Sequence, residues 1–401
     1  MLLEDGTAEQ AGLKPDRLKA IRQRAASWVT DGKTPSLVVL AARRGVIALH
    51  EAFGTLTPDP DLPPLAIESV FPVSSVSKPV TATAIMLLVE EGVLGLSRPV
   101  VDYIPELTGK GADDILVHQL LNHTSGFEDV AALTLATERL KDPIDLSDLA
   151  PNQHKRNELL LRARYGLDVG FPPGTEHCYC TFNYDLLGEI VRRISGLGLD
   201  EFARQRIFEP LGMIDASYRM EERYVGRLVK RGPGVPFGPA PEEMIGRGAV
   251  DLNDERVLDV PFGGGGMAAT ARDLAIFGQL FLNGGHYGEL ELLSRPTVEA
   301  MTRNQTQGLG TRFLGDWYPD ASYGLGWFVQ GIRPYRHMNG TLPAHGSFGH
   351  SGMGGARFWV DPVNEIVGVY LGICTEVDND TGEQKTEFDL FQNLVTAAVS
   401  D

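Results

Sequence analysis

The sequence contains few residues that could crosslink the chain or hold a metal ion. Its 401 residues include three cysteines, Cys178, Cys180 and Cys374. Three cysteines are too few for a disulfide framework, their spacing does not match that of a metal site, and a bridge between Cys178 and Cys180 would be strained. We therefore expect free thiols, no disulfide and no bound metal, as is typical of proteins in a reducing compartment.

Positive charge and long apolar runs are also scarce. The chain has 36 lysines and arginines against 53 aspartates and glutamates, which gives a formal net charge of -17 at pH 7. This balance disfavours nucleic acid and anionic membrane surfaces as partners. No apolar run reaches the roughly 18 residues that span a bilayer, and residues 1–6 lack the basic start and apolar stretch of a signal peptide. We expect a cytoplasmic protein that acts on a small molecule; the sequence does not indicate its oligomeric state.

Motifs of several large enzyme classes are missing. The chain has no Gly-x-Ser-x-Gly, which disfavours an α/β-hydrolase triad, and no His-Glu-x-x-His. The glycine run Gly263 to Gly266 lacks the spacing and the trailing lysine of a phosphate-binding loop, so we interpret it as a tight backbone turn. No cofactor is predicted.

The order of apolar patterns predicts the fold class. Runs of β-branched and aromatic residues predict two strands within 36–53 and a hairpin made by 355–360 and 366–373. Helical patterns lie between them and at both ends, at about 15–30, 159–167, 183–195, 199–207, 271–282 and 387–399. The sequence therefore predicts an α+β fold in which both ends of the chain build one central antiparallel sheet flanked by helices.

The length of the chain indicates two packed subdomains, because a single core stops growing at about 250–300 residues. We assign residues 1–80 and 255–401 to a sheet-containing subdomain and residues 81–254 to an inserted, mostly helical one. The active site is expected at their interface. The stretch Gly232 to Glu242, rich in glycine and proline, is predicted to be a surface loop.

The most informative feature is a serine and a lysine three residues apart, Ser75 and Lys78, at the start of an apolar segment that ends near Leu94. Side chains at i and i+3 share a helix face. If the helix begins near Ser75, its free backbone N–H groups favour a developing negative charge. A partly desolvated amine loses its proton more easily and can take the proton of the hydroxyl. The pattern predicts an activated nucleophile, although a serine N-cap followed by a surface lysine would give the same spacing.

Two further segments carry groups that could act on a substrate. Tyr179 lies in a turn that leads into a predicted helix, and a phenol near an ammonium can have its pKa lowered enough to relay protons. His350 lies in a glycine-rich stretch directly before a predicted strand, where a ligand could approach the backbone closely. Each could also be structural, the tyrosine as a packed side chain and the histidine with its glycines as part of a bulge.

Taken in order, three segments resemble the serine β-lactamase and penicillin-binding-protein superfamily, closest to class C β-lactamases and family VIII carboxylesterases. They are Ser75-x-x-Lys78, the Pro173-Gly174-Thr175 segment with Tyr179, and His350-Ser351-Gly352. Residues 120–127, 264–274 and 354–362 are also similar to that group, and the similarity runs from about residue 37 to residue 371. The resemblance implies a β-lactamase/transpeptidase-like fold.

The resemblance also implies roles for individual residues. Ser75 would be the nucleophile that accepts the acyl group, and Lys78 its base or proton-sharing partner. Tyr179 would relay protons to the leaving group and in deacylation. The backbone N–H groups of Ser75 and Met353 would form an oxyanion hole, and such donors are typically worth several kcal/mol of the barrier. Substrate binding would fall to Thr181, His350 and Gly352.

Two departures from the family pattern bear on the substrate. Where the family has Tyr-x-Asn, this chain has Thr181 in place of the asparagine that holds a β-lactam's acylamide group, unless Asn183 substitutes for it. Where the family has the lysine of Lys-Thr-Gly, this chain has His350 and gives up a fixed charge for a substrate carboxylate. Protonation of His350 would restore a preference for carboxylates below about pH 6.5. We therefore expect a carboxylesterase that acts on small, mostly uncharged esters.

Other activities are compatible with the same residues. A β-lactamase or a D-amino-acid-releasing peptidase is the nearest alternative, for which a cytoplasmic location is awkward because peptidoglycan lies outside the membrane. An acyltransferase is another. A catalytically silent penicillin-binding-like protein is a third, against which the presence of Ser75, Lys78 and Tyr179 together argues. The acyl and alcohol groups are not predicted; five aromatic residues could line an apolar pocket or belong to the core, namely Trp317, Tyr318, Trp327, Phe348 and Trp359.

Overall fold

The centre of the molecule is a seven-stranded sheet. The computed structural model describes residues 1–400 except 57–63, 231–258, 314–315, 332–339 and 378–383. The strand order is β1-β3-β2-β14-β13-β12-β11. All neighbours are antiparallel except the edge pair β1–β3. The strands are β1 (Glu4–Asp5), β2 (Ser36–Arg43), β3 (Val46–Gly54), β11 (Phe328–Val329), β12 (Phe348–Gly352), β13 (Ala356–Asp361) and β14 (Ile366–Gly372). Because β14 pairs with β2, the prediction that both chain ends share one sheet is confirmed.

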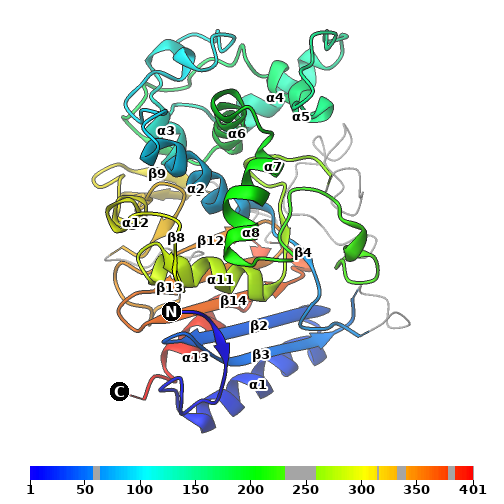
Figure 1. Ribbon diagram of the computed structural model, residues 1–401, viewed down its shortest axis with the longest axis vertical. Coiled ribbons are helices and arrows are strands. Elements are labelled where there is room, and N and C mark those ends of the chain that lie inside the picture. Colours follow the sequence, from blue (N-terminus) through cyan, green and yellow to red (C-terminus); the bar gives the residue numbers. More distant parts are fainter. Residues whose placement is uncertain (57–63, 231–258, 314–315, 332–339, 378–383, 401) are drawn as a thin grey trace.

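Helices cover both faces of this sheet, as Figure 1 shows. Helices α1 (Pro15–Thr30) and α13 (Phe388–Thr396) lie on one face, and α11 (Ala271–Leu282) lies on the other. Residues of β2 alternate between two cores. Leu37 and Val39 pack in the cluster between the sheet and the helices α1 and α13, whereas Val38 and Leu40 belong to the larger cluster that includes α11. This period of two, with both faces buried, explains why β2 is an unbroken apolar run.

The helical part of the molecule is built around α2 (Ser77–Glu90). Every residue from Ser77 to Leu88 is buried, and α2 packs against α6 (Thr181–Ser195) and α7 (Leu199–Ala203). The chain continues from α7 through a π-helical stretch, Arg204–Phe208, into α8 (Glu209–Leu211). The remaining α-helices within the described residues are α3 (Val117–Leu121), α4 (Asp129–Arg139), α5 (Lys155–Arg162) and α12 (Arg295–Thr302). The subdomain boundaries at residues 80 and 254 stay a prediction.

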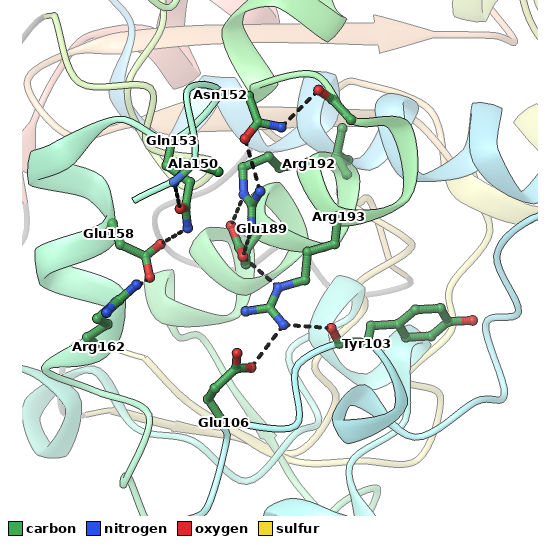
Figure 2. Close-up of polar contacts among 12 residues, drawn as sticks. Tyr103, Glu106, Ala150, Asn152, Gln153, Glu158, Arg162, Glu189, Arg192 and Arg193 are labelled. Atoms are coloured by element: carbon green, nitrogen blue, oxygen red, sulfur yellow. Dashed lines mark hydrogen bonds and ion pairs between the residues drawn. The ribbon is translucent and has the colours of Figure 1, made fainter. Parts of the chain in front are cut away.

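Buried carboxylates on the outer helices α5 and α6 are paired with arginines of the same helix, as Figure 2 shows. The carboxylate of Glu189 on α6 accepts hydrogen bonds from Arg192 and Arg193, and that of Glu158 on α5 accepts one from Arg162. Two polar hollows of about 450 and 420 Å³ lie beside this network. Buried carboxylates need charged partners, so these pairs have a structural role. Asn152, which precedes α5, accepts a hydrogen bond from Arg192 and donates one to the carbonyl oxygen of Gly196, and so ties this segment to α6.

Short two- and three-stranded pairings complete the fold. One of them, β5-β9-β10, lies beside the predicted second motif, with β5 at His177–Cys178, β9 at Thr311–Phe313 and β10 at Asp316–Tyr318. The others are β4 (Phe71–Pro72) with β6 (Ala268–Ala269), β7 (His286–Tyr287) with β8 (Leu290–Glu291), and β15 (Glu376–Val377) with β16 (Gln384–Lys385). Within the described residues the three cysteines are free, and no helix is long and apolar enough to cross a membrane.

Most predicted elements are present, with shifted ends. The helices at 15–30 and 271–282 are confirmed at both ends. The helix predicted at 159–167 instead covers Lys155–Arg162, because His154 accepts a hydrogen bond from the backbone N–H of Asn157 and so starts it earlier. The predicted surface loop at 232–242 lies outside the described residues.

Candidate active site

Ser75 and Lys78 are brought together at the start of α2. Ser75 lies in the 3₁₀ turn η1 (Ser74–Val76), and α2 begins at Ser77, slightly later than predicted. Ser74 has a left-handed backbone with φ of 50°, which an ordinary residue rarely adopts. The Lys78 Nζ atom lies 3.1 Å from the Oγ atom of Ser75. The predicted pairing of hydroxyl and amine is therefore present in the structure.

A glycine turn fixes the amine from the other side. Lys78 Nζ donates a hydrogen bond of 2.7 Å to the carbonyl oxygen of Gly264, and Thr81 Oγ1 donates one of 2.7 Å to that of Gly263. A Cβ atom on Gly263 would lie 2.1 Å from the carbonyl oxygen of Tyr184, so this approach requires glycine. The predicted backbone turn is confirmed, and its carbonyl is a lysine partner that the sequence did not reveal.

Burial changes the proton affinity of Lys78. Its side chain is completely buried, and this loss of solvation lowers the pKa of the amine to about 8. The carboxylates of Asp129 and Asp185 act in the opposite direction, but their effect is smaller. At neutral pH roughly one amine in ten is then uncharged and able to accept a proton. This confirms the expectation that the lysine loses its proton more easily than usual.

Tyr179 lies between β5 and α6, and its hydroxyl group contacts Ser75. The hydroxyl is hydrogen-bonded to Ser75, and Lys78 Nζ lies 4.8 Å from the centre of the phenol ring. Burial raises the pKa of Tyr179 well above its ordinary value. The prediction that the ammonium lowers this pKa is therefore wrong: burial of the phenol outweighs the nearby charge. Tyr179 keeps its proton throughout the neutral range.

The second-motif position Thr181 is held by an acidic residue. Asp129, the first residue of α4, accepts a hydrogen bond of 2.7 Å from the backbone N–H of Thr181, the first residue of α6. A carboxylate at a helix N-terminus is electrostatically favourable. The sequence analysis missed Asp129 because 52 residues separate it from Thr181. The only indication in the sequence was an acidic residue at the start of a helix.

Asn183 does not replace the missing motif asparagine. Its side chain is completely buried, its Oδ1 atom accepts a hydrogen bond of 2.8 Å from Ser125 Oγ, and its Nδ2 atom lies 3.2 Å from His123 Nδ1. All of these partners belong to the interior. The amide is therefore engaged by the protein and cannot hold a substrate in this arrangement.

The third motif runs along β12 and lies against η1. Gly352 is pressed onto this turn: a Cβ atom there would lie 2.0 Å from the carbonyl oxygen of Val73. Met353 follows it, and its side chain is exposed. The two segments that carry the predicted oxyanion donors, Ser75 and Met353, are thus adjacent. Only glycine permits this approach of β12 to the serine turn.

His350 is neutral, contrary to the prediction that it gains charge near pH 6.5. Its side chain is buried, and burial, together with the charge of Lys78, lowers its pKa well below the ordinary value. Its Nδ1 atom lies 2.8 Å from the carbonyl oxygen of Ser351 and its Nε2 atom 3.1 Å from the hydroxyl of Tyr323. A carbonyl only accepts, so Nδ1 carries the proton and Nε2 accepts from Tyr323. Both ring nitrogens are used within the protein.

A cation nevertheless lies beside the third motif. Arg357 on β13 is opposite Ser351 in the sheet, and its Nη1 atom donates hydrogen bonds of 2.7 Å and 2.9 Å to the carbonyl oxygens of Gly352 and Ala356. Its place beside the third motif could not be predicted, because cross-strand neighbours depend on register. Its guanidinium is directed at backbone carbonyls.

The described residues contain no group of three or more His, Cys, Asp or Glu side chains able to hold a metal ion. Of the five aromatic residues considered for a pocket, Trp327, Trp359 and Phe348 are buried in the cores, whereas Trp317 is 54% exposed. The residues that line the two polar hollows include none of the motif side chains.

Comparison with known proteins agrees with this fold. A protein from Escherichia coli O157:H7 named as a candidate D-alanyl-D-alanine carboxypeptidase is 26% identical, covering 92% of this chain and 85% of its own. A penicillin-binding-protein homologue from Caulobacter crescentus superposes with a TM-score of 0.72 at 22% identity, covering 96% of this chain and 97% of the homologue. A family VIII carboxylesterase superposes with a TM-score of 0.69 at 20% identity, covering 96% and 98%.

The sequence model of one family spans almost the whole chain. It is the β-lactamase family, and it matches residues 18–382. The match includes Ser75, Lys78, Tyr179 and His350, and the observed β-lactamase/transpeptidase-like fold is the one that the sequence predicts. This protein belongs to the β-lactamase family, within the superfamily of serine hydrolases that share this fold.

Proposed function

We propose that the protein is a serine hydrolase that cleaves small, mostly uncharged carboxylic esters through a covalent acyl-Ser75 intermediate. The observation that carries the proposal is the contact of Lys78 Nζ and the Tyr179 hydroxyl with one oxygen, Ser75 Oγ. A buried amine whose pKa is about 8 is a base for this oxygen, and a phenol that keeps its proton is a proton donor for the leaving group.

Acylation begins with attack of Ser75 Oγ on the ester carbonyl carbon. The hydroxyl proton passes to the uncharged amine of Lys78 as the bond forms. The carbonyl oxygen becomes an oxyanion, which the backbone N–H groups of Ser75 and Met353 are placed to stabilise. When the tetrahedral intermediate collapses, the alkoxide receives a proton from the Tyr179 hydroxyl, and Tyr179 is reprotonated by the Lys78 ammonium. The products are the free alcohol and acyl-Ser75.

Deacylation repeats these steps with water as the nucleophile. Water gives its proton to Lys78 through Tyr179 and attacks the acyl carbon, and Ser75 leaves with that proton. No other base is needed, because the same amine is uncharged again after the alcohol departs.

Three observations favour uncharged esters over β-lactams. Thr181 is tied to the Asp129 carboxylate, Asn183 is buried among protein partners, and His350 is neutral. Neither Thr181 nor Asn183 therefore offers a β-lactam a free side-chain amide, and the carboxylate of a β-lactam would approach a site that contains the acid Asp129. The positive charge of Arg357 would by itself favour a substrate carboxylate, but its Nη1 atom donates to backbone carbonyls. Losing a charge-assisted hydrogen bond typically costs about 1.5–3 kcal/mol.

The proposal is tested by a substrate panel. We would measure kcat/KM for p-nitrophenyl esters of increasing acyl length, for nitrocefin and for a D-alanyl-D-alanine peptide, with Ser75→Ala as the blank. The proposal expects short esters to be hydrolysed well and the other two poorly. Nitrocefin turned over as efficiently as the best ester would make the protein a β-lactamase. Preferred cleavage of the dipeptide would make it a peptidase, and product formed only with an added alcohol acceptor would make it an acyltransferase.

A further inference from the structure

His123 lies directly behind Tyr179 and has an unusual backbone. It follows α3 and has a left-handed conformation with φ of 58°, although it is neither glycine nor asparagine. Its side chain is completely buried. A left-handed backbone is uncommon for a residue with a Cβ atom, although histidine adopts it more often than most residues do, and such residues cluster at functional sites. Here the residue contacts the segment that carries Tyr179.

His123 holds this segment at three points. Its carbonyl oxygen accepts a hydrogen bond of 2.9 Å from the backbone N–H of Cys178, the residue before Tyr179. Its ring Nδ1 atom accepts one of 3.1 Å from the backbone N–H of Cys180, the residue after it. The imidazole lies against the phenol of Tyr179, with ring centres 4.3 Å apart. Backbone on both sides of the tyrosine and the tyrosine ring itself are thus fixed by one residue.

The contacts define the protonation state that this arrangement requires. A backbone N–H only donates, so Nδ1 is an acceptor and the neutral ring carries its proton on Nε2. The Asn183 amide faces the same nitrogen at 3.2 Å, and its Oδ1 accepts from Ser125, which leaves Nδ2 as the second donor. Burial and the nearby His177, Lys78 and His350 keep the pKa of His123 well below its ordinary value. A protonated ring would place its Nδ1–H group against the backbone N–H of Cys180, and the hydrogen bond between them would be lost.

We propose that His123 is a positioning residue that holds the Tyr179 hydroxyl on Ser75, with the neutral Nε2–H tautomer as its working form. The inference rests on the proposed function, in which Tyr179 relays protons. It predicts that His123 acts on the reaction only through Tyr179, since the hydrogen bonds and ring contacts of its carbonyl group and side chain are with the segment Cys178 to Cys180, with Asn183 and with neighbouring aromatic rings.

The sharpest variant is His123→Asn. Asparagine tolerates a left-handed backbone, so the carbonyl contact to Cys178 can persist, but its shorter side chain has no ring to pack on Tyr179. We expect kcat for p-nitrophenyl butyrate to fall about 10- to 100-fold, as for a catalytic group misplaced by about 1 Å, with little change in KM. His50→Asn, at a partly buried histidine on β3, is the matched control and should keep the wild-type rate.

A double-variant comparison separates positioning from general damage. In the Tyr179→Phe background, His123→Asn should lower kcat no further, as for residues that act as one unit. Multiplicative losses would overturn the inference, and so would a His123→Asn enzyme with wild-type kcat while Tyr179→Phe alone is strongly impaired. Near-normal turnover by Tyr179→Phe would instead overturn the relay step of the proposed function, and with it this inference.

The tautomer can be tested in the unaltered protein. With ¹⁵N-labelled histidine, the His123 signals, assigned by their absence in His123→Asn or His123→Gln, should show a proton on Nε2, none on Nδ1, and no titration between about pH 5.5 and 8.5, the range in which an ordinary histidine titrates. A proton on Nδ1, or titration in this range, would overturn the inference whatever the kinetics of the variants.

Discussion

The first and second motifs of the site are held in place by different means. Ser75 and Lys78 lie three residues apart on one turn and the start of a helix that is buried along most of its length. Tyr179 lies on a short non-helical connection between β5 and α6, and this connection is held by contacts from His123 and Asp129, which lie 50 or more residues away in the sequence. The nucleophile and base are thus positioned by local helix geometry, whereas the proton relay is positioned by tertiary contacts.

The two motifs also differ in how burial changes their proton affinity. Burial favours the neutral form of both groups, which lowers the pKa of the Lys78 amine and raises that of the Tyr179 phenol. The amine therefore becomes a usable base near neutral pH, while the phenol remains a donor. One environment prepares two groups for opposite tasks.

The largest effect should come from Lys78→Arg. A guanidinium remains charged at all accessible pH values and cannot accept the serine proton. We expect kcat/KM for p-nitrophenyl butyrate to fall by about two to four powers of ten, the usual contribution of a general base. In the wild type, kcat/KM should rise with pH through about 8, the pKa of Lys78. If Lys78→Arg kept more than a tenth of the wild-type kcat/KM, another group would have to be the base.

Lys78→Met should stabilise the protein at neutral pH. The ordinary pKa of lysine is 10.5 and that of folded Lys78 is about 8, so between these values the unfolded chain binds more protons and stability rises with pH. Below about pH 8 the wild type therefore bears a penalty of about 3 kcal/mol, less about 1 kcal/mol for the hydrogen bonds to Ser75 and Gly264.

Chemical denaturation at pH 7 and pH 10 measures this difference. The variant should be about 2 kcal/mol more stable at pH 7, and its advantage should shrink toward pH 10. Lys155→Met, at an exposed lysine, is the control and should leave stability nearly unchanged. An advantage that grows with pH would contradict the lowered pKa of Lys78.

Asp129→Asn should change the pH profile more than the rate. The amide oxygen can still accept from the backbone N–H of Thr181, but the charge that raises the pKa of Lys78 is gone. The rising limb of the profile should move to lower pH, with kcat at its plateau within a few fold of wild type. Asp142→Asn, at an exposed acid after α4, should leave the profile in place. A shift to higher pH would show that Asp129 does not act on Lys78 as the structure indicates.

The smallest effect concerns His350. Because this ring stays neutral, the ratio of kcat/KM for nitrocefin to that for p-nitrophenyl acetate should be flat between about pH 5.5 and 7, where an exposed histidine would titrate. Stopped assays at several pH values in this interval measure the ratio. A ratio that rises as the pH falls would mean that His350 becomes charged in the presence of substrate.

These differences explain what the sequence could and could not predict. The Ser75–Lys78 contact follows from helix spacing, and the hairpin of β13 and β14 follows from period-two runs around a turn, so both were predictable. The Gly264 carbonyl, Asp129 and Arg357 reach the site only through the tertiary fold and strand register. The protonation of His350 near pH 6.5 was wrongly predicted because burial cannot be read from a single glycine-rich segment.

The most direct test of the account is the identity of the acylated residue. The enzyme would be mixed with p-nitrophenyl butyrate, quenched in acid during turnover, and mapped by peptide mass spectrometry, with Tyr179→Phe included because slowed deacylation should raise occupancy. The account predicts one butyryl group, on Ser75, absent from Ser75→Ala. A butyryl group on Ser77, Ser125 or Ser351, or steady hydrolysis by Ser75→Ala, would contradict it.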